Sequence, residues 1–303
     1  MKHYAPWVNW VGISKENKEH AYKEPISILD SLKVDKKIPL YNFLGTNLEL
    51  SNTPYFPHVS FDEFKYIKAD VPFHEKWNLN TGILSGDAML ILAYKFFENY
   101  QGVMFKSLIS LFSKTAIEVC EGQQYDIEFE SRTNVAIPEY LKMIEYKTAV
   151  LVGASMKMGA IVAKAPIKDQ DAIYEFGKYL GIAFQLQDDY LDSFGDSKTF
   201  GKQIGGDIVE NKKTYLYLKA MELSNNEVKS TLLNLYQEDR IKGDNEVNKV
   251  KQIFQETGAA LDTKKIIKKY TQKAFHVLND LNITSEKKTF LRQFGTSLMD
   301  REV

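Results

Sequence analysis

Cysteine is almost absent from this 303-residue sequence, and neither sign of charge is in excess. The single cysteine, Cys120, excludes an internal disulfide framework and a zinc cluster built on thiolates. Lys and Arg number 39 against 40 Asp and Glu, so the formal net charge of −1 gives no general attraction to nucleic acid or anionic lipid. We therefore expect a cytoplasmic protein with reduced thiols and no nucleic-acid partner.

Long apolar runs are also lacking. The first seven residues contain no apolar run of the signal-peptide type. The most apolar stretch, residues 149–165, is short for a membrane span and contains Lys157 and Lys164. We expect no membrane span.

Proline is scarce after residue 72, where only Pro138 and Pro166 occur. Since proline inside a helix costs about 3 kcal/mol, its scarcity permits long helices. Apolar residues recur there at three- and four-residue spacing, which predicts an all-α fold. The expected helices are Leu79–Tyr100, Val103–Arg132, one beginning near Pro138, Asp169–Asp192, and three or four more after Asp207.

The first 73 residues have a different composition. They hold six of the eight prolines and scattered aromatic residues, without a persistent helical stripe. We expect loops and turns there, with short helices at most at Ser27–Leu32 or Phe61–Ile67. The sequence thus divides into an atypical N-terminal segment, 1–73, and a helical part, 74–303, within one domain overall.

The segment Phe184–Asp192 places three carboxylates on a mostly apolar helix. Asp188 and Asp192 are four residues apart and share a face, and Asp189 lies one step round. The same stripe contains Gly177 and Gly181, which we interpret as room for a ligand beside the helix. An acidic helix end facing solvent is the plainer interpretation, but the apolar flanks indicate burial, where charges are rarely left unpaired. These residues therefore predict a Mg²⁺ site.

A glycine-rich segment with lysines, Phe200–Thr214, follows the acidic motif. Glycine lets a loop fold over a bound group, and lysine binds phosphate as a point charge. For any one lysine, an ordinary surface position is the plainer interpretation. Together with carboxylates that hold Mg²⁺, the lysines favour a diphosphate ligand.

Several short motifs in this order resemble the trans-type polyprenyl (isoprenyl) diphosphate synthases, with most similarity to the bacterial short-chain members. The resemblance covers residues 74–303 and rests on Gly86-Asp87, Gly122-Gln123 with Asp126, Lys147-Thr148, Phe184–Asp192, and Gly201-Lys202 with Asp207, Lys212 and Thr214. It implies an all-α bundle of about ten or more helices around a central cavity, usually a homodimer. It also implies a Mg²⁺-dependent prenyltransferase that joins isopentenyl diphosphate to an allylic diphosphate.

The resemblance also implies a role for each matching residue. Asp188, Asp189 and Asp192 would bind Mg²⁺, while Thr148 and Gln187 would lie near the reacting carbon and steady its positive charge. Further residues implied by position are the diphosphate-binding Lys147, Lys202 and Lys212, and the supporting Gln123, Asp126 and Asp207.

The first aspartate-rich motif of the family has no clear counterpart. Counting back without gaps, Asp62 stands at its last aspartate, whereas His58 and Val59 occupy the first two positions. The segment used for isopentenyl diphosphate has no counterpart either. Three explanations stay open: a diverged member that binds one diphosphate but condenses poorly, a non-catalytic partner subunit that binds diphosphate or regulates an active synthase, or an altered N-terminal stretch on a normal body. A terpene cyclase of the same fold is a further alternative.

Overall fold

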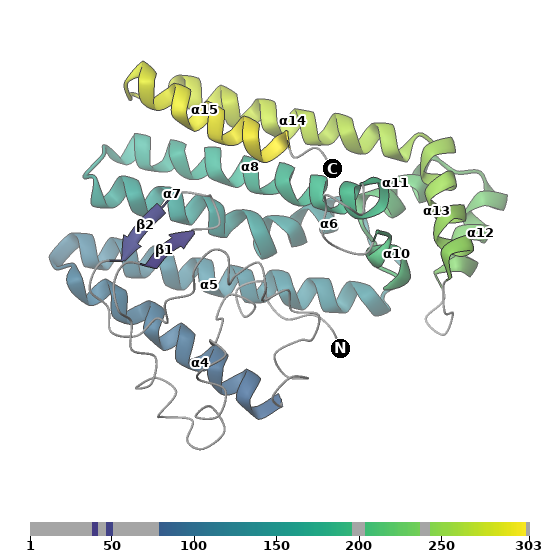
Figure 1. The fold of residues 1–303 in the computed structure, drawn as a ribbon, viewed down its shortest axis with the longest axis horizontal. Coiled ribbons are helices and arrows are strands. Elements are labelled where there is room, and N and C mark those ends of the chain that lie inside the picture. Colours follow the sequence, from purple (N-terminus) through teal and green to yellow (C-terminus); the bar gives the residue numbers. More distant parts are fainter. Residues whose placement is uncertain (1–37, 42–46, 51–78, 196–203, 237–242, 301–303) are drawn as a thin grey trace. The chain divides into compact units, whose positions relative to one another are not determined.

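The computed structural model describes residues 38–41, 47–50, 79–195, 204–236 and 243–300 (Figure 1). Asp62, Lys202 and the two short helices expected near the N-terminus lie outside these residues. The chain divides into two compact units, residues 1–100 and 101–303. Apart from one small hairpin, the described residues are helical wherever they are regular, which confirms the all-α fold.

The first unit contains the hairpin, which the sequence did not predict. Strands β1 (Ile38–Tyr41) and β2 (Asn47–Leu50) pair antiparallel, with Ile38 opposite Leu50. Four-residue strands are too short to show a clear alternation, and proline is tolerated at position 39 because a two-stranded sheet consists only of edges. The predicted helix at Leu79–Tyr100 is present as α4 (Leu79–Lys95) and a final 3₁₀ turn, η3 (Phe96–Asn99).

Three long helical stretches begin the second unit, and the sequence predicted all of them. Helix α5 spans Gly102–Ser131, and α8 spans Ile167–Phe194. Between them runs one interrupted helix: α6 (Ile137–Ile144), the π-helix η4 (Glu145–Ala149) and α7 (Val150–Val162). Pro138 lies in the first turn of α6, where a missing N–H costs nothing. The π-turn was not expected.

Six described helices follow residue 205, not the three or four predicted. They are α10 (Gly206–Val209), α11 (Tyr215–Leu223), α12 (Asn226–Leu235), α13 (Asp244–Glu256), α14 (Ala259–Asp280) and α15 (Ser285–Met299). Most are too short for periodicity to separate them, and their starts depend on caps. The Asn225 side chain, for example, accepts a hydrogen bond from the Val228 N–H at 2.9 Å.

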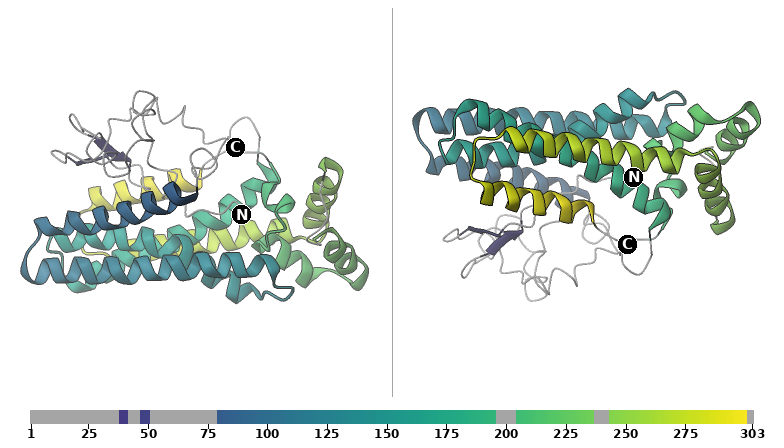
Figure 2. Two further views of the ribbon diagram at one scale, coloured as in Figure 1. Left: turned by 90° about the horizontal axis from the view of Figure 1, so that it is seen from below. Right: turned by 90° about the horizontal axis from the view of Figure 1, so that it is seen from above.

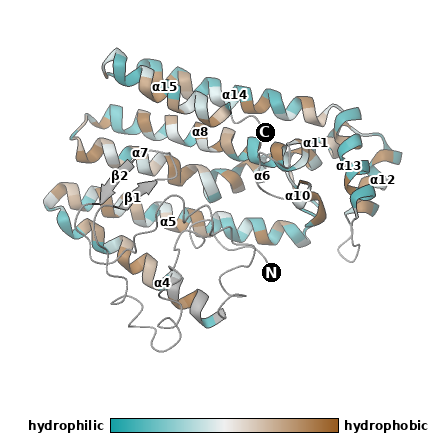
Figure 3. Ribbon diagram, in the orientation of Figure 1, coloured by the Kyte–Doolittle hydropathy of each residue, from teal (hydrophilic) through white to brown (hydrophobic). Residues whose placement is uncertain are grey.

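Helix α8 is the centre of the second unit and packs against α7 and α14 on either side (Figures 1 and 2). Helix α7 is mostly hydrophobic, whereas α14 alternates hydrophobic and hydrophilic residues, as expected for an inner and an outer helix (Figure 3). Core residues cluster along α8, with Phe176 and Leu180 in one cluster and Ile182 and Leu186 in the other.

The glycines of α8 do not leave room for a ligand, so this interpretation of the sequence is wrong. A Cβ on Gly181 would lie 2.6 Å from the Cα of Ala149, and one on Gly177 would lie 2.9 Å from the Cα of Gly153. The backbone of η4 and α7 fills that space. Glycine is therefore needed for close helix packing, which brings the π-turn against α8.

No helix in the described part of the chain is both long enough and apolar enough to cross a membrane.

Candidate functional site

The last turns of α8 carry the three aspartates predicted as a metal site. Asp189 and Asp192 are buried, with 7% and 8% of their surface exposed, whereas Asp188 is half-buried. They occupy this position because α8 continues without a break to Phe194 and contacts α6, α10 and α14. Carboxylates this deeply buried need polar partners, since an unpaired buried charge is strongly unfavourable.

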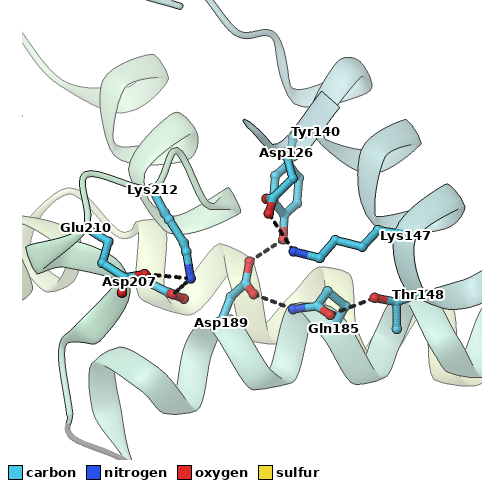
Figure 4. Close-up of polar contacts among 9 residues, drawn as sticks. All are labelled: Asp126, Tyr140, Lys147, Thr148, Gln185, Asp189, Asp207, Glu210 and Lys212. Atoms are coloured by element: carbon cyan, nitrogen blue, oxygen red, sulfur yellow. Dashed lines mark hydrogen bonds and ion pairs between the residues drawn. The ribbon is translucent and has the colours of Figure 1, made fainter. Parts of the chain in front are cut away.

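Both oxygens of Asp189 accept hydrogen bonds from neutral side chains (Figure 4). The Tyr140 hydroxyl of α6 donates to Oδ2 at 2.5 Å, and the Gln185 amide, one turn earlier on α8, donates to Oδ1 at 2.8 Å. The Oε1 atom of Gln185 in turn accepts a hydrogen bond from the Thr148 hydroxyl at 2.9 Å. One network thus joins α6, the π-turn and α8.

The π-turn η4 presents Lys147 and Thr148 to this network. Gly122 of α5 makes the approach possible, because a Cβ there would lie 2.3 Å from the Lys147 backbone nitrogen. The Lys147 ammonium pairs with Asp126 of α5 at 2.6 Å. A π-turn inside an α-helix is frequently found at functional sites, because it changes the direction in which adjacent side chains point.

A second lysine lies on the other side of Asp189 (Figure 4). The Lys212 ammonium pairs with Asp207 at 2.7 Å and with Glu210 at 3.1 Å. The turn that carries them is fixed to α8, since the Asp207 N–H donates to Asp192 Oδ2 at 3.0 Å. Gly205, with a φ of +84°, permits the turn.

The electrostatics of this region show an accumulation of negative charge. Burial and the nearby carboxylates of Asp207 and Asp188 raise the pKa of Asp189 to about 7, although its two hydrogen bonds act in the opposite direction. Burial would lower the pKa of Lys212, but Asp207 and Glu210 raise it above its usual value. A cation at this position would relieve the repulsion among the carboxylates.

The structure brings most of the predicted site residues together. Asp189, Lys147, Thr148, Asp126, Asp207 and Lys212 lie around one point (Figure 4). Gln187 faces elsewhere: its amide donates to the Met299 carbonyl at 2.8 Å, and its Oε1 is buried without a partner among the described residues. Gln123 lies next to Gly122 on α5, and its buried Nε2 likewise has no partner within the described ranges.

Sequence reasoning missed two members of the network. Gln185 could have been found, because it lies four residues before Asp189 and therefore on the same helix face. Tyr140 offered no local signal, since its contact with Asp189 joins residues 49 positions apart. The π-turn also gives no periodicity that distinguishes it from α-helix.

The carboxylates of this region fit a Mg²⁺ ion that takes only one or two ligands from the protein. Within 79–195, 204–236 and 243–300, no three Asp, Glu, His or Cys side chains gather into a group that could hold a metal ion. Mg²⁺ typically uses only one or two protein carboxylates, with waters and substrate phosphates as its other ligands. The half-buried Asp188 and the excess of carboxylates fit that mode.

The structure thus brings acidic side chains and two lysines together at the end of a buried helix (Figure 4), and comparisons with known proteins give the family of the chain. A family model described as polyprenyl synthetase matches residues 71–257, which is more than half of the chain. The chain belongs to the polyprenyl synthetase family.

Two similar proteins are isoprenoid synthases. Geranylgeranyl diphosphate synthase of Sulfolobus acidocaldarius is 35% identical over 196 residues, which is 63% of this chain and 59% of that protein. A short chain isoprenyl diphosphate synthase of Methanothermobacter thermautotrophicus is 33% identical over 175 residues, 57% of this chain and 54% of the relative. Over such matches the chain spans about half the length of these curated relatives.

Solved structures agree with the family. A crystal structure of a geranylgeranyl pyrophosphate synthase has a TM-score of 0.71 at 50% identity and covers 76% of this chain and 72% of its own. Geranylgeranyl pyrophosphate synthetase from Pyrococcus horikoshii also gives 0.71, at 28% identity, covering 80% of this chain and 74% of that one.

Proposed function

We propose that this chain is a Mg²⁺-dependent prenyltransferase that joins isopentenyl diphosphate to an allylic diphosphate and so makes a longer polyprenyl diphosphate. One observation supports this most strongly: buried carboxylates at the end of α8 lie between two lysines, Lys147 and Lys212, on other elements. That arrangement fits a diphosphate bound through a divalent cation. Family membership supplies the reaction class.

The aspartate motif Asp188, Asp189 and Asp192 would form the metal-binding side of the site. Bound Mg²⁺ would neutralise the charge of the diphosphate and so help it to leave. Lys147 and Lys212, each with three N–H donors, would bind diphosphate oxygens while keeping their carboxylate partners, and Lys202 would join them. Asp126 and Asp207 would hold the two lysines in position, with Gln123 supporting the first of them.

In the reaction, the carbon–oxygen bond of the allylic diphosphate breaks and the diphosphate leaves with the electron pair. The double bond of isopentenyl diphosphate then attacks the allylic carbon, and a proton is lost to the departing diphosphate. Thr148, whose hydroxyl is fixed by Gln185, would place its dipole near the developing positive charge. Gln187 is the weaker candidate for this role, because its amide nitrogen is engaged by α15.

Asp62 is proposed only as a remnant of the first aspartate-rich motif. A homodimer in the cytoplasm, and a central cavity that holds the growing chain, remain predictions from the family resemblance.

The test is a condensation assay on the full chain with Mg²⁺, labelled isopentenyl diphosphate and dimethylallyl, geranyl or farnesyl diphosphate in turn. We expect label in a longer product and its loss in Asp188→Asn. Asp280→Asn, an exposed substitution at the end of α14, is the matched control.

Two other results would contradict the proposal. Farnesyl diphosphate that binds with Mg²⁺ but incorporates no label would favour a diphosphate-binding partner subunit. Release of diphosphate from farnesyl diphosphate without isopentenyl diphosphate, with a cyclic hydrocarbon as product, would favour a terpene cyclase.

A further inference from the structure

Asp189, on the last turns of α8, is engaged through both of its carboxylate oxygens. Each of its oxygens already accepts a hydrogen bond from a fixed neutral donor, the hydroxyl of Tyr140 or the amide of Gln185. Tyr140 is only 1% exposed and its ring packs near that of Tyr215, so the hydroxyl cannot move away without repacking the core. The direction of the Asp189 carboxylate is therefore set by the protein.

The network does not end at Asp189. Gln185 must point its nitrogen at the carboxylate, so its oxygen is left to accept from Thr148 at 2.9 Å. Thr148 neighbours Lys147 in the π-turn, and the Lys147 ammonium is held at 2.6 Å from Asp126. The orientation of one amide thus links the acidic side of the site to the lysine side.

We propose that Tyr140 and Gln185 are positioning residues that fix the direction of the Asp189 carboxylate. Asp189 is then a hydrogen-bond relay: it connects the aspartate motif to the π-turn and does not bind Mg²⁺ directly. The inference rests on the proposed function, because it concerns the same diphosphate site. It narrows that function, since it assigns direct metal contact to the half-buried Asp188 and not to Asp189.

A purely structural role explains the observations less well. A buried tyrosine hydroxyl needs a partner, but a backbone carbonyl or an asparagine would satisfy Tyr140 at a lower cost than a carboxylate. Asp189 is instead buried close to two other carboxylates, Asp188 and Asp207, where each charge disfavours the others. Removal of a group that supports a metal site without touching the metal typically costs about 10- to 100-fold in metal affinity or activity.

The experiment compares Tyr140→Phe with Tyr215→Phe in the full chain. Both changes remove one tyrosine hydroxyl that donates to a carboxylate, but the partner of Tyr215 is Asp262 of α14, at 3.1 Å, which does not belong to the aspartate motif. Binding of inorganic pyrophosphate is measured by calorimetry with and without Mg²⁺, and thermal unfolding confirms that each variant folds. We expect Tyr140→Phe to weaken Mg²⁺-dependent binding about 10- to 100-fold, and Tyr215→Phe to leave it unchanged.

Two aspartate variants separate a relay from a ligand. Asp189→Asn should keep the number of Mg²⁺ ions bound with pyrophosphate and lose affinity by a factor similar to that of Tyr140→Phe. The double variant should be little weaker than either single one, because the two residues share one hydrogen bond. Asp188→Asn should instead lower the number of Mg²⁺ ions bound.

The inference is overturned if Asp189→Asn loses a Mg²⁺ ion as Asp188→Asn does, or if Tyr140→Phe binds like Tyr215→Phe. Both results leave the proposed function standing, because the unaltered protein still binds pyrophosphate with Mg²⁺. If the unaltered protein shows no Mg²⁺-dependent binding, the proposed function itself fails and the inference fails with it.

Discussion

Replacing Gly122 by alanine should separate α5 from the π-turn and so disturb both stability and binding. A Cβ at this position would lie 2.3 Å from the backbone nitrogen of Lys147, and 2.7 Å from the carbonyl carbon of Tyr146. Ordinary contacts between such atoms are about 3.5–4.0 Å. Because the neighbouring atoms belong to the backbone and not to a flexible side chain, the two helical segments must move apart by roughly 1 Å.

The cost of that movement can be worked out from known effects. Overpacking in a close-packed interior costs about 1–3 kcal/mol, and the better helix propensity of alanine offsets at most about 1 kcal/mol of it. With that offset the net cost is about 0–2 kcal/mol, so for a unit of this size we expect the melting temperature to fall by up to about 8 °C. A displacement of about 1 Å at Lys147 and Thr148 should reduce condensation more severely, by about 100-fold.

The assay is a thermal melt, a pyrophosphate titration and the condensation assay on Gly122→Ala and on a matched control, Gly159→Ala. Gly159 is an exposed position inside α7, and a Cβ there would meet no heavy atom within 4 Å. This control should therefore gain about 0.5–1 kcal/mol and bind pyrophosphate normally. If Gly122→Ala melts and binds like the control, the close approach of α5 and the π-turn does not exist in solution.

Two further predictions concern charge. The folded pKa of Asp189, about 7, lies above the ordinary value of 3.8, so its contribution to stability is complete below about pH 4 and is lost as the pH rises through 7. At 1.36 kcal/mol per pKa unit, the loss is about 4 kcal/mol. Urea unfolding of the metal-free proteins should therefore show that Asp189→Asn is more stable than the unaltered protein at pH 8 but not at pH 4. An equal difference in stability at both pH values contradicts this. Lys213 donates hydrogen bonds at 2.8 and 2.9 Å to two of the last carbonyls of α5. Lys213→Met should therefore lower the stability by about 1 kcal/mol and leave pyrophosphate binding unchanged. Weakened binding with unchanged stability would show that Lys213 binds the ligand and does not cap the helix.

The long helices could be predicted from the sequence because their signals are local and repeated. Residues 73–303 contain only two prolines, and apolar residues recur over many turns, so α5 and α8 were placed to within two residues at each end. The shorter helices after residue 205 were undercounted, since four to fifteen residues give too few turns to separate one pattern from the next. Their boundaries follow from caps such as Asn225.

The site was predicted only as far as its chemistry is local. Asp188, Asp189 and Asp192 are distinguished by their spacing on one helix, and their motif could be found without knowing the fold. Tyr140 could not, because only the packing of α6 on α8 brings its hydroxyl to Asp189. The direction of a carboxylate depends on such distant donors.

The same packing explains why this site needs glycine as much as it needs charge. Lys147 reaches the site from the π-turn, which lies close to α5 through Gly122 and close to α8 through Gly181. A side chain at either position would push the turn outward and break the hydrogen bond between Thr148 and Gln185. Groups fixed on packed helices are held more accurately than groups on loops, and phosphate binding through a lysine and a carboxylate-held metal depends on that accuracy. The close helix contacts are therefore part of the binding site, although none of these glycines can bind a ligand through a side chain.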